Sequence, residues 1–470
     1  MQWARASNKE KEEQGRIALR QRISWMVMKV LIVALPGYQF MLVAMGVGAI
    51  ILASISDVTN SAAATTTVDE LIRRLDSASF IEREDASRQL QQCGAEAMEP
   101  LANAAVGPSR EVATRALIIL QVLAGNDDIS VAALAAAALR RVADDPATCL
   151  PLLAKRICSK CEVRLRERYV RRFARLGAVV SMDHSNNVRI RFNKVWRGTD
   201  DDLQELFELF PPVSVNIEES SMGDNVVELL ADATTLQDVY LGQSQATGKG
   251  LAEVCRLPRL RYLSLRGLRL REDAFAALAT ATSVQMLGLD ETNITDAQLE
   301  HCGHLPNLNT LWLNSTAVSD EGLKHLAELP KLEKLYLTRL KLAGPGLEAL
   351  KDVVSLRYLS LQEVPLSDSQ ASSLVHLKQL TTLGLDQTKI SDEGLGFVAQ
   401  LNNLETLWLD GTKVSDASCD EIAKLTKLKK LYLRQTKIST DGKRKIADAI
   451  KTCRIYYPNS DSTGDAMPQE

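Results

Sequence analysis

A 24-residue pattern recurs ten times in phase between Phe210 and Ala449, without insertion or deletion between copies. Each copy has leucine or an equivalent apolar residue at its third, sixth and eighth places, as in Leu380, Leu383 and Leu385. A unit of this length cannot bury its own apolar side, so neighbouring copies must stack into a solenoid. The pattern therefore determines the architecture of more than half of the 470-residue chain.

The first half of each copy predicts a short strand. In the eighth copy we expect it over Thr381–Leu385, because the two-residue alternation of a strand turns Leu383 and Leu385 into the solenoid. Thr382 and Gly384 then face outward on the concave surface. Residues between the core leucines therefore define the concave face.

The second half of each copy predicts a turn and a short convex helix. Thr388 is expected to be buried, with its hydroxyl bonded to the backbone of a neighbouring coil. Ser391 or Asp392 is expected to cap a helix that carries Leu395 inward. The threonine recurs at Thr292, Thr316, Thr412 and Thr436, and Leu268, Leu340 and Val364 replace it.

This combination of leucines, a threonine and an Ile-Ser/Thr-Asp-x-Gly-Leu segment resembles the cysteine-containing branch of leucine-rich repeats, with threonine in the cysteine position. The resemblance implies an α/β horseshoe of about eleven repeats. The whole chain is similar to bacterial membrane-anchored proteins that join a helical array to such a solenoid. That family implies interaction with a partner and names no ligand.

Residues 30–55 carry no formal charge, and about 20 apolar residues suffice to cross a membrane. The basic segment 1–29 precedes them, so the positive-inside rule predicts a cytoplasmic N-terminus and extracytoplasmic repeats. The alternative, a cleaved signal peptide, has an apolar core of only about 7–15 residues. We therefore predict one uncleaved transmembrane helix.

An all-α segment is predicted at 68–176, after a linker at 56–67. It resembles HEAT or armadillo repeats on two motifs, Phe80-Ile-Glu-Arg-Glu-Asp-Ala-Ser-Arg-Gln-Leu and Arg110-Glu-Val-Ala-Thr-Arg-Ala. Among its helices we expect Arg110–Leu123, Ser130–Val142 and Glu162–Leu176.

Open solenoid ends expose apolar faces and need caps. At the N-terminal end, 177–209 predicts a hairpin whose second strand, Val188–Phe192, is a degenerate first repeat. The solenoid occupies 210–457 and ends in a strand at Arg454–Tyr457. The polar tail 458–470 is predicted to be disordered.

The outward position between the two core leucines of each strand follows a cycle of Tyr, Ser, Gly and Trp every four repeats. The blocks Thr234–Leu329 and Pro330–Leu425 therefore indicate duplication of a four-repeat module. Groups of aromatic residues are predicted to recur on the concave face, about 19 Å apart. Seven residues form this candidate site: Tyr240, Tyr262, Trp312, Tyr336, Tyr358, Trp408 and Tyr432.

Exposed aromatic side chains are enriched at binding hot spots, which favours a concave platform for an extended partner, either protein or glycan. A line of lysines is expected beside them, namely Lys341, Lys389, Lys413 and Lys437. The alternative is that duplication copied residues that suit strands, without any ligand.

No catalytic residue, metal site or cofactor is predicted. Cys158 and Cys161 form a CxxC motif, but no second pair stands at zinc-ribbon spacing, and the expected context is helical. His301 and His304 have no carboxylate placed with them. The acidic run at 200–202 fits a helix N-terminus. A net charge of −3 gives no reason to expect a nucleic-acid partner.

The sequence thus favours a membrane-anchored binding scaffold. A self-assembling structural protein of the cell envelope is the main alternative. An enzyme without recognisable motifs is a third hypothesis, and a cytoplasmic adaptor is disfavoured by the charges that flank the apolar segment.

Overall fold

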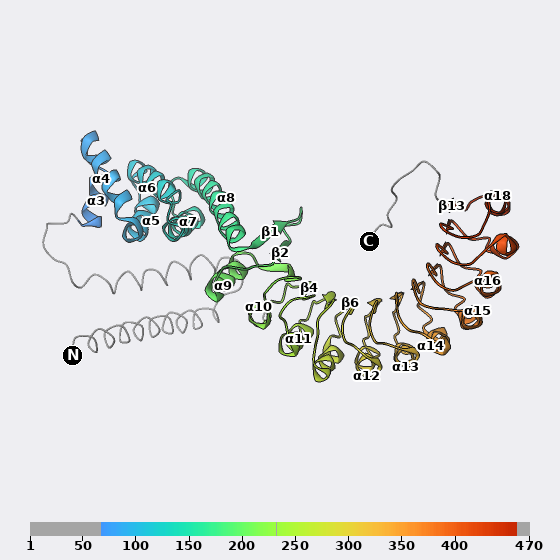
Figure 1. Cartoon of the computed structure of the whole chain (residues 1–470). Helices are drawn as coiled ribbons and strands as arrows, with labels where there is room; N and C mark the ends of the chain where they lie inside the picture. Colours follow the sequence, from blue (N-terminus) through green and yellow to red (C-terminus); the bar gives the residue numbers. More distant parts are fainter. Residues whose placement is uncertain (1–66, 232, 458–470) are drawn as a thin grey trace, which may run out of the picture. The chain divides into compact units, whose positions relative to one another are not determined.

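The computed structural model describes residues 67–231 and 233–457, and the chain divides into two compact units between Arg172 and Phe173 (Figure 1). The predicted basic segment 1–29, the apolar segment 30–55, nearly all of the linker and the tail 458–470 lie outside the described residues. Within the described ranges, no helix has the length and apolar character needed to cross a membrane.

The first unit is built from helices. Their bounds are α3 (Val68–Arg74), α4 (Phe80–Gln92), α5 (Met98–Val106), α6 (Arg110–Leu123), α7 (Ile129–Asp144) and α8 (Pro151–Leu176), the last of which contains the unit boundary. The core between them consists of leucines such as Leu101 and Leu117 and of alanines such as Ala135, all fully buried. The helix predicted at Arg110–Leu123 is confirmed, and the HEAT-like or armadillo-like character of the unit remains a prediction.

The helix predicted at Glu162–Leu176 in fact begins at Pro151, so its predicted start was wrong. Apolar residues at spacings of three and four extend the buried stripe toward the N-terminus, as Ala154, Ile157 and Cys161 show. The CxxC motif therefore lies on one face of a long helix.

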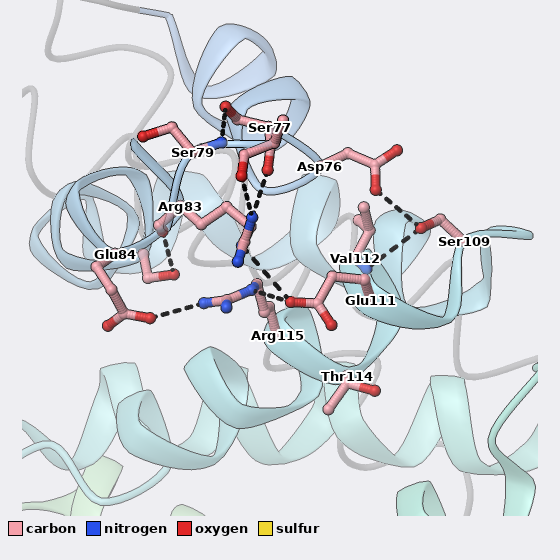
Figure 2. Close-up of polar contacts among 12 residues, drawn as sticks. Asp76, Ser77, Ser79, Arg83, Glu84, Ser109, Glu111, Val112, Thr114 and Arg115 are labelled. Atoms are coloured by element: carbon pink, nitrogen blue, oxygen red, sulfur yellow. Dashed lines mark hydrogen bonds and ion pairs between the residues drawn. The ribbon is translucent and has the colours of Figure 1, made fainter. Parts of the chain in front are cut away.

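The polar residues of the two motifs tie α4 to α6 (Figure 2). Arg115 of α6 donates hydrogen bonds to Glu111 at 2.7 Å and to Glu84 of α4 at 2.8 Å. Arg83 of α4 donates to the carbonyl of Ser77, at 2.6 Å, before its own helix begins. These contacts give the motifs a structural role within the unit.

The second unit is a solenoid whose described strands form one 13-stranded sheet in chain order. β1 (Ala178–Met182) pairs antiparallel with β2 (Val188–Phe192), and every later pairing is parallel. The predicted hairpin is thus present, and its role as a cap remains a prediction. The other strands are β3 (Pro212–Asn216), β4 (Asp238–Tyr240), β5 (Tyr262–Ser264), β6 (Met286–Gly288), β7 (Thr310–Trp312), β8 (Lys334–Tyr336), β9 (Tyr358–Ser360), β10 (Thr382–Gly384), β11 (Thr406–Trp408), β12 (Lys430–Tyr432) and β13 (Arg454–Tyr456).

Short helices line the outer side of the solenoid, and the strands line its inner side (Figure 1). Leu380, Leu383 and Leu385 are fully buried between these layers, as the repeat pattern predicts. The α-helices are α9 (Asp200–Leu209), α10 (Asp224–Leu230), α11 (Gly248–Cys255), α12 (Asp296–Leu299), α13 (Asp320–Leu323), α14 (Pro345–Ala349), α15 (Asp368–Ala371), α16 (Asp392–Val398), α17 (Cys419–Ala423) and α18 (Thr440–Ala449). A 3₁₀-helix at Glu272–Thr280 replaces the α-helix in one repeat.

One prediction about the polar residues of the repeat needs correction, and the predicted N-cap is confirmed. The Thr388 hydroxyl donates to the carbonyl of Leu385 at 2.7 Å, within its own repeat and not to a neighbouring coil. The chain turns back tightly here, because the intervening Gln387 has a left-handed φ of 58°. Ser391 is the N-cap of α16, but its hydroxyl donates to Asp368 of the preceding repeat.

Candidate functional site: an aromatic ladder on the concave face

The parallel register brings the seven predicted aromatic residues onto one side of the sheet. Trp312, for example, aligns with Tyr336 on the next strand and with Gly288 on the preceding one. Each of the seven side chains is half-buried, with part of its surface open to solvent. The predicted position of these residues on neighbouring strands is therefore correct, and their role in binding remains a prediction.

The rings form one continuous row, which we call the aromatic ladder. Successive ring centroids are 4.8, 6.0, 5.4, 4.7, 6.0, 5.5 and 4.4 Å apart. Its eight members, in order, are Tyr240, Tyr262, Trp312, Tyr336, Tyr358, Trp408, Tyr432 and Tyr456.

The sequence predicted separate groups of rings, and the structure joins them. Ser264 and Gly288 leave space over two strands because they are small, and both are buried. The ring of Tyr262, two residues before Ser264, spans this space and contacts Trp312 edge-on at 6.0 Å. Tyr358 makes the equivalent contact with Trp408 in the second copy of the module, also at 6.0 Å.

Tyr456 is a member of the ladder that the sequence prediction missed. It aligns with Tyr432 in the parallel pairing of β12 and β13, and the two rings stack at an angle of 7°. The Arg454 guanidinium lies over the Tyr456 ring, 5.0 Å from its centroid. The 24-residue spacing from Tyr432 was the signal that could have identified it.

Stacking within the ladder determines what its rings present to a partner. Trp312 stacks on Tyr336 at 16° and Trp408 stacks on Tyr432 at 21°, so these ring faces are occupied by neighbours. Each stacked pair therefore covers one face of both of its rings. Aromatic edges carry partial positive charge, which suits oxygen acceptors.

The tyrosine hydroxyls are protonated at neutral pH, and burial raises the pKa of several of them further above it. It raises the pKa of Tyr262 to about 12, and it also raises the pKa values of Tyr240, Tyr358 and Tyr432. A neutral hydroxyl can both donate and accept a hydrogen bond. The ladder is thus an uncharged surface with regularly placed polar groups.

Carboxyl groups follow the ladder two residues further along several strands. Asp386 accepts a hydrogen bond from the backbone N–H of Asp410 at 2.9 Å, and Asp410 accepts one from that of Arg434 at 2.6 Å. Burial raises the pKa of Asp386 to about 7. Burial also raises the pKa of Asp290, the equivalent residue of the first module.

The four predicted lysines are exposed, and each follows the buried threonine position of its repeat. Lys389, for instance, comes two residues after Gln387, whose left-handed backbone ends the concave segment. The lysines therefore lie past the turn and not between the rings. The backbone N–H groups of Lys389, Lys413 and Lys437 bond the preceding repeat, as Lys389 does to the Leu366 carbonyl at 3.0 Å.

The cysteines and histidines that the sequence raised as candidates for metal or redox chemistry lie in the following surroundings. Cys158 and Cys161 are buried free thiols in the first unit, and burial raises the pKa of Cys158 to about 12. His304 is exposed and lies 3.6 Å from Glu328. Over the residues that the structure describes, no group of three or more His, Cys, Asp or Glu side chains could hold a metal ion.

The in-phase repeats and the parallel sheet define an α/β leucine-rich repeat solenoid. No family model and no curated protein matches the chain. Among solved structures, it is similar to an internalin (inlF) of Listeria monocytogenes, with 19% identity, a TM-score of 0.40, and coverage of 59% of this chain and 87% of that one. A second internalin of that organism, internalin C2, has 19% identity, a TM-score of 0.26, and coverage of 57% and 87%.

A plant peptide hormone receptor, RGFR1 in complex with RGF2, is also similar, with 13% identity and a TM-score of 0.33. The likeness covers 54% of this chain and 48% of the receptor. Similarity at these levels concerns the repeat fold and carries no information about a partner.

Proposed function

We propose that this protein is an interaction scaffold that binds an extended segment of a protein partner along the aromatic ladder. The observation that supports this most is the continuity of the eight half-buried rings on the concave face. Half-buried aromatic side chains desolvate readily and are enriched at the centres of interfaces. A long, narrow row of them suits an extended chain better than a globular surface.

The stacked geometry favours a polypeptide over a glycan, the two partners that the sequence left open. Sugar rings bind aromatic residues by lying flat on exposed faces, whereas stacking covers one face of each ring in three pairs of the ladder. The ladder also carries tyrosine hydroxyls and indole N–H groups, which form hydrogen bonds. Backbone carbonyls and amides of an extended segment can satisfy such groups at short, regular intervals.

We further propose that residues 30–55 anchor the protein in a membrane and that the solenoid faces outward from the cytoplasm. The support for this is the uncharged length of the segment and the basic residues that precede it. The proposed partner is then a protein of the same compartment or of the cell surface.

Site-specific photo-crosslinking in the native cells tests the function. A benzophenone amino acid replaces Trp408 in the full chain, and in a control it replaces Val354, which is 73% exposed but lies outside the ladder. We expect a protein adduct from the first position and none from the second. Adducts only with further copies of this chain support the structural alternative, and adducts only with carbohydrate contradict a polypeptide partner.

The Trp312→Ala/Trp408→Ala double variant provides the second measurement. With the crosslinker at Tyr336, between the two tryptophans, we expect the adduct to fall at least tenfold, since hot-spot aromatic residues typically contribute 2 kcal/mol or more each. The Val354→Ala variant should leave the adduct unchanged. Equal adduct formation in the double variant would show that the ladder does not carry the interaction.

A further inference from the structure

A basic cavity of about 540 Å³ lies at the N-terminal end of the concave face, within the second unit. Four of its lining side chains are cations and two are anions. The cations are Arg175, Arg191, Lys194 and Arg197, and the anions are Glu218 and Glu219.

The backbone fixes the walls of this cavity. The N–H of Asn193 donates to the carbonyl of Gly177 at 2.8 Å, and that of Arg197 donates to the carbonyl of Leu176 at 2.8 Å. Gly177 has a φ of 109°, and a Cβ there would lie 2.6 Å from the carbonyl oxygen of Val195. The segment 193–197 is therefore held tightly against the end of α8.

The two acidic side chains are already engaged. Glu219 lies 3.4 Å from the Lys194 ammonium, and Glu218 accepts a hydrogen bond from the Ser264 hydroxyl at 2.7 Å. By contrast, Arg175, Arg191 and Arg197 form no ion pair with an acidic side chain in the described part of the chain. The cavity thus has three guanidinium groups whose charge is not neutralised by a direct partner.

The cavity is continuous with the aromatic ladder through the strand register. Arg191 of β2 aligns with Asn216 of β3, which in turn aligns with Tyr240, the first ring of the ladder. Adjacent strands are about 4.8 Å apart, so Arg191 lies roughly 10 Å before the ladder begins. An extended segment on the ladder needs about three more residues to reach it.

We propose that this cavity binds an oxyanion, a carboxylate or a phosphate, carried by the polypeptide that occupies the ladder. Guanidinium groups bind both oxyanions through paired N–H donors. Binding of the oxyanion is a property of the cavity alone. Its place on the ladder-bound partner rests on the proposed function.

The test uses the full chain and fluorescein-labelled peptides in fluorescence polarisation. The probes are hexaglutamate, a hexamer of alternating phosphoserine and glycine, and two uncharged references, hexaglutamine and the unphosphorylated serine–glycine hexamer. We expect at least one anionic probe to bind and neither reference to bind. The stronger anionic probe identifies the source as carboxylate or phosphate.

A charge-matched pair of variants locates the binding. Arg191→Gln/Arg197→Gln removes two cations from the cavity, and Arg256→Gln/Arg271→Gln removes two exposed cations elsewhere on the solenoid. We expect the first variant to bind the anionic probe at least tenfold more weakly and the second to bind it as the unchanged protein does. Equal weakening in both variants, or no binding of either anionic probe, overturns the proposal.

The same assay separates this proposal from the function of the ladder. The Trp312→Ala/Trp408→Ala variant should keep its affinity for the anionic probe, because neither tryptophan lines the cavity. Loss of partner crosslinks with retained probe binding therefore concerns the ladder alone. If the unchanged protein forms the partner crosslinks but binds neither anionic probe, the oxyanion site is refuted and the proposed function of the ladder is not affected.

Discussion

Asp368 of one repeat holds Ser391 at the start of the next. One carboxylate oxygen accepts the Ser391 backbone N–H at 2.7 Å, and the other accepts its hydroxyl at 2.5 Å. The same pair of bonds links Asp392 to Ser415 at 2.7 and 2.6 Å. The Ser-Asp pair therefore connects these neighbouring convex helices: Ser391 receives Asp368 of the preceding repeat, and Asp392 reaches Ser415 of the following one.

We predict that Asp368→Ala lowers the free energy of unfolding by about 1–3 kcal/mol, because it removes two charge-assisted hydrogen bonds from a partly buried site. Urea denaturation measures the change. Asp352→Ala is the control, since Asp352 is exposed, and a change within about 0.5 kcal/mol is expected there. Equal stability of the two variants would show that the inter-repeat bond contributes little.

The ladder's continuity depends on Tyr358, which contacts Tyr336 at 4.7 Å and Trp408 at 6.0 Å. We predict that Tyr358→Ala destabilises the solenoid by about 2 kcal/mol and makes Trp408 more accessible to iodide quenching. Tyr358→Phe keeps the ring, so its quenching should match that of the unchanged protein. If the alanine variant also leaves quenching unchanged, Tyr358 does not cover the gap over Gly384.

Replacing Asp386 by an uncharged residue is expected to stabilise the protein in a pH-dependent way. Its pKa is about 7 in the folded chain and near 3.8 when unfolded, so above pH 7 folding places a charged carboxylate in a buried site. The native state binds more protons between these values, and this unfavourable contribution grows as pH rises from about 4 to 7. Asp386→Asn should therefore be more stable than the unchanged protein at pH 8, on the order of 2 kcal/mol, and similar to it at pH 4.

Denaturation at both pH values measures the difference. Asparagine keeps an oxygen that can accept the Asp410 N–H, so the hydrogen bond survives the change. Asp352→Asn serves as the control for the loss of an exposed charge and should show no such pH dependence. A gain of equal size at both pH values would contradict burial of the charge as the cause.

The 24-residue period predicted the strands, their register and the fully buried core positions. Leucines at two-residue alternation determine which side of a strand faces inward, and this is a local property of the sequence. The period likewise put Tyr240 and Tyr262 on adjacent strands, as the structure has them. The buried positions of a repeat can therefore be predicted from the sequence of a single copy.

Contacts between repeats were less predictable. The bond from Ser391 to Asp368 and the contact of Tyr358 with Trp408 join residues 23 and 50 positions apart, and their geometry depends on side-chain rotamers. The basic cavity also escaped prediction, because the turn after β2 brings Lys194 and Arg197 to Arg175 without any repeated signal. Irregular backbone has no period from which its partners can be inferred.

The glycines of α16 provide a test of how repeats interlock. Gly394 lies against the preceding repeat, and a Cβ at this position would overlap the Asp368 carboxylate. Gly396 lies two residues later in the same helix and has no atom within 4 Å of where its Cβ would be. The two positions share a backbone conformation and differ in what surrounds them.

We predict opposite effects of alanine at these positions in urea denaturation. Gly396→Ala should stabilise the protein by up to about 1 kcal/mol, because alanine has the higher helix propensity and nothing obstructs its methyl group. Gly394→Ala should destabilise it by about 2 kcal/mol, because the methyl group forces Asp368 away from Ser391. In the Asp368→Ala background the cost of Gly394→Ala should shrink, since the obstructing carboxylate is gone. An unchanged cost there would mean that Gly394 is required for another reason than the inter-repeat aspartate.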